Sequence, residues 1–370
     1  MRIAQVTPLW EQVPPSAYGG TEMIVSLLTE ELVRRGHEVT LFATGDSETS
    51  ARLLPGCDRA LRPLGMLPSD YERYERQQLI EVFAMADQFD IIHCHTGAAA
   101  VPYAQRSQTP VVHTLHLPFT PDSEKIFCQH RQQNLISISN AQQRPELELN
   151  YVATVYNAIA LEQFEFYPQP EQPPYLAFLG RMSEAKGPHR TIAIAKRSGL
   201  PLKMAGKVSF EEKDFFEAEV APQIDGEQVQ FLGEVSQSAK KELLGKATAT
   251  LFPISWPEPF GLVMAESMAS GTPVIAMALG AAPEIVVDGK TGFLAHTVDD
   301  CVEAVARVHA ISRQGCHDHV SLNFGVGRMV DGYEAAYQRV LGDRLKPTYR
   351  LQTPRANRQP GRPEPVKATL

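Results

Sequence analysis

Short hydrophobic runs alternate along the chain with longer segments whose hydrophobic positions recur every three or four residues. The runs have the length of buried strands, and the longer segments have the period of amphipathic helices. Strands that alternate with helices form parallel sheets with helical crossovers. The pattern therefore predicts an α/β fold built on doubly wound parallel sheets. In the first half the predicted strands are Ile3–Val6, Val39–Phe42, Ile91–Cys94, Val111–Thr114, Leu135–Ile138 and Ala153–Tyr156.

The alternation stops at residues 159–174, a segment with four prolines, and then begins again. Such a segment is typical of a linker between domains. We therefore predict one domain at residues 1–158, a linker at 159–174 and a second domain at 175–327. Ligands are expected at the carboxyl ends of the strands and in the cleft between the domains. The predicted strands of the second domain are Leu176–Leu179, Leu202–Ala205, Val229–Leu232, Thr250–Phe252 and Val274–Met277.

Two helices have clear signals. The helix predicted at Thr21–Arg35 ends at Gly36, and glycine is favoured just beyond a helix end. A C-terminal helix at 328–346 has one apolar face, and we expect it to pack back toward the first domain. Residues 347–370 hold five prolines and several arginines, a composition that predicts a disordered tail. A solvated tail is favoured over one that contacts a membrane or nucleic acid.

The composition, 43% hydrophobic and 21% charged, is typical of a globular protein with a full core. The net charge of -8 argues against a nucleic-acid partner. The five cysteines include no CxxC pair, which favours a reducing compartment, the cytoplasm, over a disulfide framework. The longest uncharged run, Ser267–Pro283, is interrupted by glycine and proline, so no integral membrane segment is expected.

The most informative stretch is Trp-Pro-Glu-Pro-Phe-Gly at residues 256–261. Glu258 precedes a proline, which disfavours helical geometry and places it in a loop. Pro259 suits the first turn of a helix that would run to about Ser270. The free N–H groups of Phe260, Gly261 and Leu262 would then form an anion site.

Glu266 lies on the same helix, about 8–9 Å from its start at about 1.5 Å per residue. Two carboxylates so placed could hold a sugar and a ribose on either side of a diphosphate, since a carboxylate accepts two hydroxyl hydrogen bonds. The alternative is that Glu266 caps or solvates a helix and Glu258 decorates a loop. Two prolines, two aromatic residues and a glycine in one turn favour the functional interpretation.

Cations and glycines occur at two other predicted strand-to-helix turns. Arg181 and Lys186 follow a strand and the turn at Gly180, where two cations could neutralise a diphosphate. Solvated surface cations are the alternative. Gly19 and Gly20 allow close approach of a phosphate or sugar to the backbone. No GxGxxG follows the first strand, which argues against a nicotinamide dehydrogenase.

Four histidines, His93, His95, His113 and His116, occur at the ends of two predicted strands. They raise the possibility of a metal site. There is no HExxH and no Asp-x-Asp, so no metal and no cofactor are expected. His116 is better placed than His113 to leave its strand and face the cleft.

Taken together, these motifs resemble those of the retaining GT-B glycosyltransferases of family 4. The spacing of Glu258 and Glu266 resembles the family's E-x7-E motif, and Gly180-Arg181 with Lys186-Gly187 resembles its GR…KG phosphate motif. The resemblance extends from Met1 to about Leu341, and its subgroup resembles the antibiotic-biosynthesis members. Further matches in order are Tyr18–Glu22, Thr114–His116, Phe231–Gly233, Ser270–Val274 and Pro283–Gly289.

The resemblance implies two Rossmann-like domains facing across a cleft and a nucleotide-diphospho-sugar donor. A UDP-glucose-like donor is the first choice, and the motifs do not distinguish UDP from GDP or glucose from another hexose. It implies that Arg181 and Lys186 hold the diphosphate and that Glu266 holds the ribose. Glu258, with the backbone of residues 260–262, would hold the sugar. It also implies that Gly19, Gly20 and His116 face the reaction from the first domain, and that transfer is metal-independent and occurs on the front face.

Two other classes share this plan. A nucleotide-sugar 2-epimerase would release nucleotide and altered sugar without an acceptor. A non-catalytic nucleotide-sugar-binding subunit would keep the donor residues and lose the chemistry. Both glutamates and His116 are present, which favours an active hexosyltransferase. The acceptor, whether a sugar, a lipid-linked molecule or a small molecule, is not identified by these motifs, because acceptor loops vary within one fold.

Overall fold

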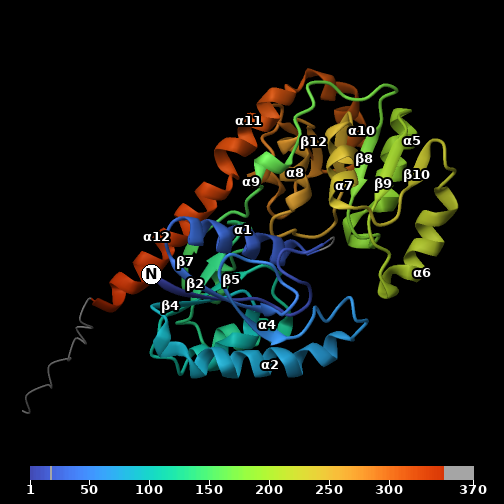
Figure 1. Cartoon of the computed structure of the whole chain (residues 1–370). Coiled ribbons are helices and arrows are strands. Elements are labelled where there is room, and N and C mark those ends of the chain that lie inside the picture. Colours follow the sequence, from blue (N-terminus) through green and yellow to red (C-terminus); the bar gives the residue numbers. More distant parts are fainter. Residues whose placement is uncertain (17–18, 346–370) are drawn as a thin grey trace, which may run out of the picture.

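The computed structural model describes residues 1–16 and 19–345, which form two α/β lobes (Figure 1). The first lobe has a seven-stranded sheet in the order β3-β2-β1-β4-β5-β6-β7, and the second has a six-stranded sheet in the order β10-β9-β8-β11-β12-β13. All pairings between these strands are parallel. In each sheet the first strand in sequence, β1 or β8, lies in the interior. The next two strands are added on one side of it and the later strands on the other, as in doubly wound nucleotide-binding folds. The predicted fold class is confirmed. The predicted tail at 347–370 lies outside the described residues.

The element bounds follow. The strands are β1 (Arg2–Val6), β2 (Glu38–Thr44), β3 (Arg52–Cys57), β4 (Ile91–Cys94), β5 (Val111–Leu115), β6 (Asn134–Ser137), β7 (Tyr151–Thr154), β8 (Leu176–Leu179), β9 (Leu202–Ala205), β10 (Val229–Phe231), β11 (Ala249–Phe252), β12 (Val274–Met277) and β13 (Gly292–Ala295). The helices are α1 (Gly20–Arg34), α2 (Pro68–Ala84), α3 (Val101–Ala104), α4 (Pro121–Gln129), α5 (Pro188–Ser198), α6 (Lys213–Phe215), α7 (Gln237–Gly245), α8 (Leu262–Ala269), α9 (Ala282–Ile285), α10 (Val298–Arg307), α11 (Arg313–Asn323) and α12 (Val326–Leu345).

The sequence analysis did not predict strands β3 and β13, and both lie at sheet edges. Strand β3 contains Pro55 and Gly56, residues that are depleted in strands and tolerated mainly at edges. Strand β13 begins with Gly292 and has only four residues. The strand predicted at Ala153–Tyr156 is in fact β7, two residues earlier.

Helix α1 ends as its sequence predicts. Gly36 has a φ of 87°, and its N–H donates to the carbonyl of Val33. The N–H of His37 donates to the carbonyl of Leu32. These two bonds satisfy helix-end carbonyls in the Schellman arrangement, which glycine favours because it adopts positive φ without strain.

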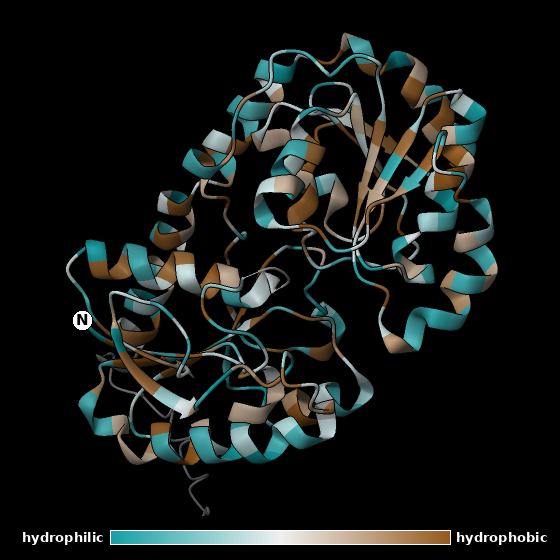
Figure 2. Cartoon of the chain, turned by 45° about the vertical axis from the view of Figure 1, so that its right-hand side comes forward, coloured by the Kyte–Doolittle hydropathy of each residue, from teal (hydrophilic) through white to brown (hydrophobic). Residues whose placement is uncertain are grey.

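Helix α12 leaves the second lobe and runs along the first beside α1 (Figure 1). Its residues Val330, Tyr333 and Tyr337 are fully buried in a cluster that includes Ile3 and Leu28 of the first lobe. Hydropathy shows the same layering: the strands are mostly hydrophobic, and the helices are hydrophilic on their outer faces (Figure 2). Helix α12 therefore completes the first lobe's core.

The chain crosses between the lobes at two adjacent places. Ile159 forms a bridge with Gly325, just before α12. Beside this crossing, the carboxylate of Glu284 accepts hydrogen bonds from the backbone N–H groups of Asn140 and Ala141, at 2.8 and 2.7 Å, and from the Tyr156 hydroxyl at 2.7 Å. One carboxylate of the second lobe thus holds a loop and a tyrosine of the first.

Candidate functional site

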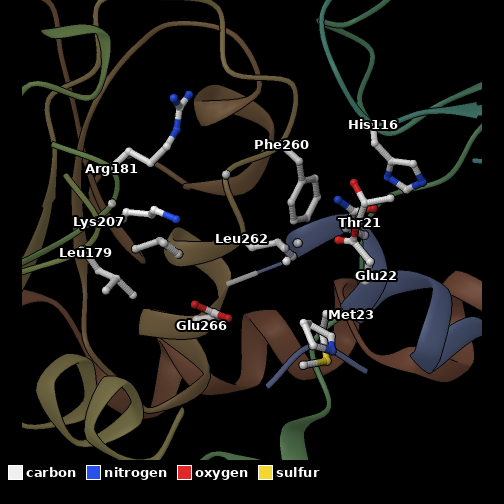
Figure 3. A pocket seen from close by; sticks show the side chains of 18 of the residues that line it. Thr21, Glu22, Met23, His116, Leu179, Arg181, Lys207, Phe260, Leu262 and Glu266 are labelled. Carbon is white, nitrogen blue, oxygen red and sulfur yellow. The ribbon is translucent and has the colours of Figure 1, made fainter. Parts of the chain in front are cut away.

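A cavity of about 350 Å³ lies between the lobes, at the carboxyl ends of β1, β5, β8 and β11 (Figure 3). It lies beside the points where both strand orders reverse, the usual ligand position in such sheets. In Figure 3, Arg181 and Lys207 lie on one side, and His116, Thr21 and Glu22 on the other. All ten residues singled out in the sequence line this cavity: Gly19, Gly20, His116, Arg181, Lys186, Glu258, Phe260, Gly261, Leu262 and Glu266.

The loop after β11 holds Glu258, as predicted. The N–H of Ala281 donates to the Glu258 carbonyl at 2.9 Å, and a side chain at Gly280 would collide with the Glu258 backbone. The N–H of Ser255 donates to the carbonyl of Ala185, which fastens this loop to the one that carries Lys186. Close backbone contacts therefore position Glu258.

Helix α8 begins later than predicted, so the expectation for Pro259 is wrong. Gly261 has a φ of 84° and precedes the helix, which starts at Leu262. The left-handed turn at Gly261 keeps Pro259 and Phe260 in the loop, so the helix-start N–H groups belong to residues from Leu262 onward. Glu266 is four residues beyond this start, or about 6 Å at 1.5 Å per residue, rather than 8–9 Å.

Lys186 and Glu258 form an ion pair between Lys186 Nζ and Glu258 Oε2. Their side chains are only 17% and 13% exposed. The Lys186 ammonium also lies 5.2 Å from the centre of the Trp256 ring and 5.8 Å from that of Phe252, within cation–π range. Phe252, at the end of β11, and Trp256, in the loop, thus both lie near this cation, whereas Phe260 packs against Tyr156 and Phe324.

Arg181 follows β8 and Gly180, as predicted, and its guanidinium donates to Glu212 Oε1 at 2.7 Å. The Arg181 side chain remains 41% exposed. Gly206 packs so closely on Gly180 that a side chain there would overlap the Gly180 carbonyl. The turn that aims Arg181 at the cavity therefore depends on contact with the next strand's loop.

Glu266 accepts a hydrogen bond from Lys240 Nζ at 2.6 Å. The Lys240 side chain is 17% exposed and that of Glu266 is 13% exposed. Lys240 lies on α7 and was not singled out in the sequence, nor was Glu212. Nothing in their local sequence marks them, because each is placed by a helix that packs beside the site. Lys207, after β9, also lines the cavity.

The first lobe contributes the turn between β1 and α1. Gly19 has a φ of 151°, and a side chain there would collide with Pro15. A Cβ on Gly20 would lie 3.3 Å from Leu262 Cδ1, so the two lobes touch at this point. Gly20 therefore permits close approach of the lobes beside the cavity, and Gly19 permits the tight turn against Pro15 that precedes α1.

His116 leaves β5 and faces the cavity, whereas His113 is fully buried beside Gln133. Burial lowers the pKa of His116 to about 4, so its imidazole is neutral near pH 7. His95 lies 2.8 Å from His116. Among residues 1–16 and 19–345, no three His, Cys, Asp or Glu side chains are grouped so that they could hold a metal ion.

Glu22 is a cavity residue whose side chain the sequence analysis did not single out. It is 2% exposed, and its Oε1 has no hydrogen-bond partner in the described part of the chain. Burial raises its pKa to about 7. An acid in the first turn of a helix is common, so its sequence position gave no sign of this environment.

The fold and this cavity define the class: a GT-B glycosyltransferase, with the two lobes of a nucleotide-sugar enzyme facing one cleft. The Glycosyltransferase Family 4 model matches residues 18–196, and the Glycosyl transferases group 1 model matches residues 160–314. The chain belongs to this family, the group 1 or family 4 glycosyltransferases, which are retaining hexosyltransferases that use nucleotide-sugar donors.

Individual relatives are distant. The D-inositol 3-phosphate glycosyltransferase of Mycolicibacterium smegmatis is 25% identical over 409 residues, covering 93% of this chain and 91% of that protein. AviGT4, a glycosyltransferase involved in avilamycin A biosynthesis, has a TM-score of 0.68 at 23% identity, covering 93% of this chain and 98% of its own. Anabaena HepE, solved with UDP and glucose, has a TM-score of 0.70 at 18% identity, covering 92% and 100%. These two structures share the fold, and the first is of the antibiotic-biosynthesis kind.

No helix in the described ranges is both long enough and apolar enough to cross a membrane.

Proposed function

We propose that this chain transfers a hexose from a UDP-hexose, with UDP-glucose the first candidate, to a sugar, lipid-linked or small-molecule acceptor, and that it needs no divalent metal. The observation that carries the proposal is a cavity in which Arg181, Lys186, Glu258 and Glu266 of the second lobe face His116 and the glycine turn of the first. The presence of UDP and glucose in the HepE structure supports the choice of donor to test first.

In this proposal Arg181 and Lys186 hold the diphosphate. Both are partnered by carboxylates in the structure, so donor oxygens would replace Glu212 and Glu258 as their partners. Charge-assisted contacts of this kind strengthen as negative charge develops on the leaving diphosphate. The two cations supply the neutralisation that magnesium would otherwise give.

The released Glu258, with the backbone of residues 260–262, binds the hydroxyls of the sugar, and Glu266 binds those of the ribose. The bond between C1 and the diphosphate oxygen breaks, and the acceptor oxygen bonds to C1 on the same face. The acceptor's proton passes to the leaving diphosphate. His116, Gly19 and Gly20 face this reaction from the first lobe.

A panel of UDP- and GDP-sugars tests the proposal, first by thermal shift and then by turnover after exhaustive EDTA treatment. A donor at 100 times its Kd stabilises the folded state by about 2.7 kcal/mol. We expect a UDP-hexose to raise the Tm of the wild type and to raise that of Arg181→Ala less.

Three outcomes would overturn the proposal: no shift with any UDP-hexose, loss of activity that only magnesium or manganese restores, or an altered sugar released with free nucleotide in the absence of acceptor. The last result would identify an epimerase.

A further inference from the structure

His116 is connected to the C-terminal helix through a continuous buried chain of hydrogen bonds. His116 Nε2 lies 2.8 Å from His95 Nδ1, and His95 Nε2 lies 2.8 Å from Gln5 Oε1. Gln5 Nε2 donates to the Tyr337 hydroxyl on α12 at 3.1 Å. Gln5 and Tyr337 are fully buried, and His95 is 3% exposed. This chain of hydrogen bonds thus joins a residue of the cavity to α12.

The chain continues beyond Tyr337. The Tyr337 hydroxyl lies 2.7 Å from His93 Nδ1, and His93 Nε2 lies 2.7 Å from Thr114 Oγ1. Thr114 in turn donates to the Tyr333 hydroxyl at 3.3 Å. Gln5, His93 and Thr114 lie on the adjacent strands β1, β4 and β5, whose shared face α12 covers.

The protons in this chain have one consistent order. Because Gln5 donates from Nε2 to Tyr337, its Oε1 must accept a proton from His95 Nε2. A neutral imidazole has one donor and one acceptor, so His95 Nδ1 accepts and His116 Nε2 donates. The far end of the chain agrees, since donation from Thr114 to Tyr333 requires His93 to donate to Thr114 and to accept from Tyr337.

The three imidazoles in this chain of hydrogen bonds, those of His93, His95 and His116, are neutral near pH 7. Burial lowers the pKa of His93 and His95 well below the usual value, and nearby histidines lower them further. A proton added to any of them would face this burial and the other two rings. The donor and acceptor positions that the hydrogen bonds set are therefore kept near neutral pH.

We propose that this chain of hydrogen bonds fixes His116 as the tautomer protonated on Nε2, so that its Nδ1 lone pair is the hydrogen-bond acceptor presented to the cavity. Tyr337, Gln5 and His95 are then positioning residues for His116. The catalytic consequence rests on the proposed function, because it requires that His116 faces the reacting sugar. The tautomer itself does not depend on any substrate.

Two measurements test the proposal. The first is the 15N spectrum of histidine-labelled wild type, in which His116 is assigned with His116→Gln. We expect a protonated Nε2 and an unprotonated Nδ1. A His116 protonated on Nδ1, or an even mixture of tautomers, would overturn the proposal without any assay of activity.

The second measurement compares Tyr337→Phe with Tyr175→Phe. Tyr175 is a matched control, since it is also buried and its hydroxyl donates to the Leu243 carbonyl in the second lobe. Tyr337→Phe should give mixed His116 tautomers and a kcat about three- to tenfold lower, the effect of about one hydrogen bond, with the Kd of UDP unchanged. Gln5→Leu should do the same if Tyr337→Phe fails to fold.

Tyr175→Phe should leave the His116 spectrum as in wild type. If Tyr337→Phe and Gln5→Leu both retain a single His116 tautomer, the positioning role is overturned. Absence of transfer from every sugar nucleotide, with the wild-type tautomer as expected, would instead contradict the proposed function alone.

Discussion

Lys240 and Glu266 form an ion pair inside the cavity, with Lys240 Nζ 2.6 Å from Glu266 Oε1. The Lys186–Glu258 pair lines the same site, as does Arg181, which is paired with Glu212. These acidic and basic groups therefore neutralise one another, and a donor that uses them must exchange each contact for one of its own. The strength of these pairs should set donor affinity as much as the new contacts do.

Glu266→Gln and Glu258→Gln should separate nucleotide binding from sugar positioning. Glu266→Gln removes the charged acceptor for ribose hydroxyls, and should weaken UDP and the whole donor alike, by about 1.5–3 kcal/mol. Glu258→Gln should spare UDP and lower kcat, because it disturbs the sugar. Calorimetry with UDP and turnover with the full donor measure the two effects. Equal loss of UDP affinity with unchanged kcat would contradict this division of roles.

Glu212→Gln should tighten UDP binding. The substitution removes the charge that competes for Arg181, yet its amide oxygen can still accept from the Ser209 N–H, as Glu212 does now. Because the Arg181 side chain is 41% exposed, the pair is worth about 0.2–1 kcal/mol, or up to about fivefold in Kd. Calorimetry checks this, with Glu242→Gln, from the remote Lys246 pair, as the control. Weaker binding by Glu212→Gln would show that Glu212 aims Arg181 rather than competing for it.

Glu22→Gln should make the protein less sensitive to rising pH. The folded-state pKa of Glu22 is raised to about 7 from an ordinary 4.5, so the folded state keeps a proton that the unfolded state releases. Stability therefore falls as the pH rises from about 4.5 to 7, by about 3 kcal/mol at 1.36 kcal/mol per pKa unit. Gln keeps the shape of the protonated acid and avoids this loss.

Urea denaturation of wild type and Glu22→Gln at pH 5 and pH 8 measures the difference. The buried histidines have lowered pKa values and act in the opposite direction, but they are present in both proteins and cancel. We expect the variant to gain stability relative to wild type at pH 8. A constant difference across the pH range would mean that Glu22 is ionised in the folded protein.

Glu284→Gln should loosen the contact between the lobes. The carboxylate accepts from two backbone N–H groups, the Asn140 amide and the Tyr156 hydroxyl, and this contact, with burial, raises the Tyr156 pKa to about 12. An amide has one oxygen and no charge, so we expect a loss of about 1–3 kcal/mol in the free energy of unfolding. Urea denaturation tests this, with the exposed Glu303→Gln as the control. Equal stability of both variants would show that the loops meet without help from this carboxylate.

The sequence predicted the elements that follow local rules. Hydrophobic runs identified the central strands, and the unusual loop around Glu258 together with the cations after β8 identified one wall of the cavity. Lys240, Glu212 and the buried state of Glu22 could not be predicted in this way. Their roles come from helices and turns that meet only in the folded chain, and each is an ordinary charged residue in its own segment.

The start of α8 shows a second limit. Pro259 fits a helix start by local rules, but Gly261 adopts a left-handed conformation, and the helix begins after it, at Leu262. A side chain at Gly261 would collide with Met264 and Phe252, and this crowding is visible only in the folded chain.

The position of α12 has a consequence for the order in which the protein can be made. Synthesis proceeds from the N-terminus, yet the face of the first sheet that carries Gln5 and His93 is covered by Tyr333 and Tyr337, which follow the whole second lobe in the sequence. Domains usually fold as they are synthesised. Here the first lobe is synthesised before the second but completed after it, so during translation its apolar face stays uncovered until α12 has been made, or is shielded by a chaperone.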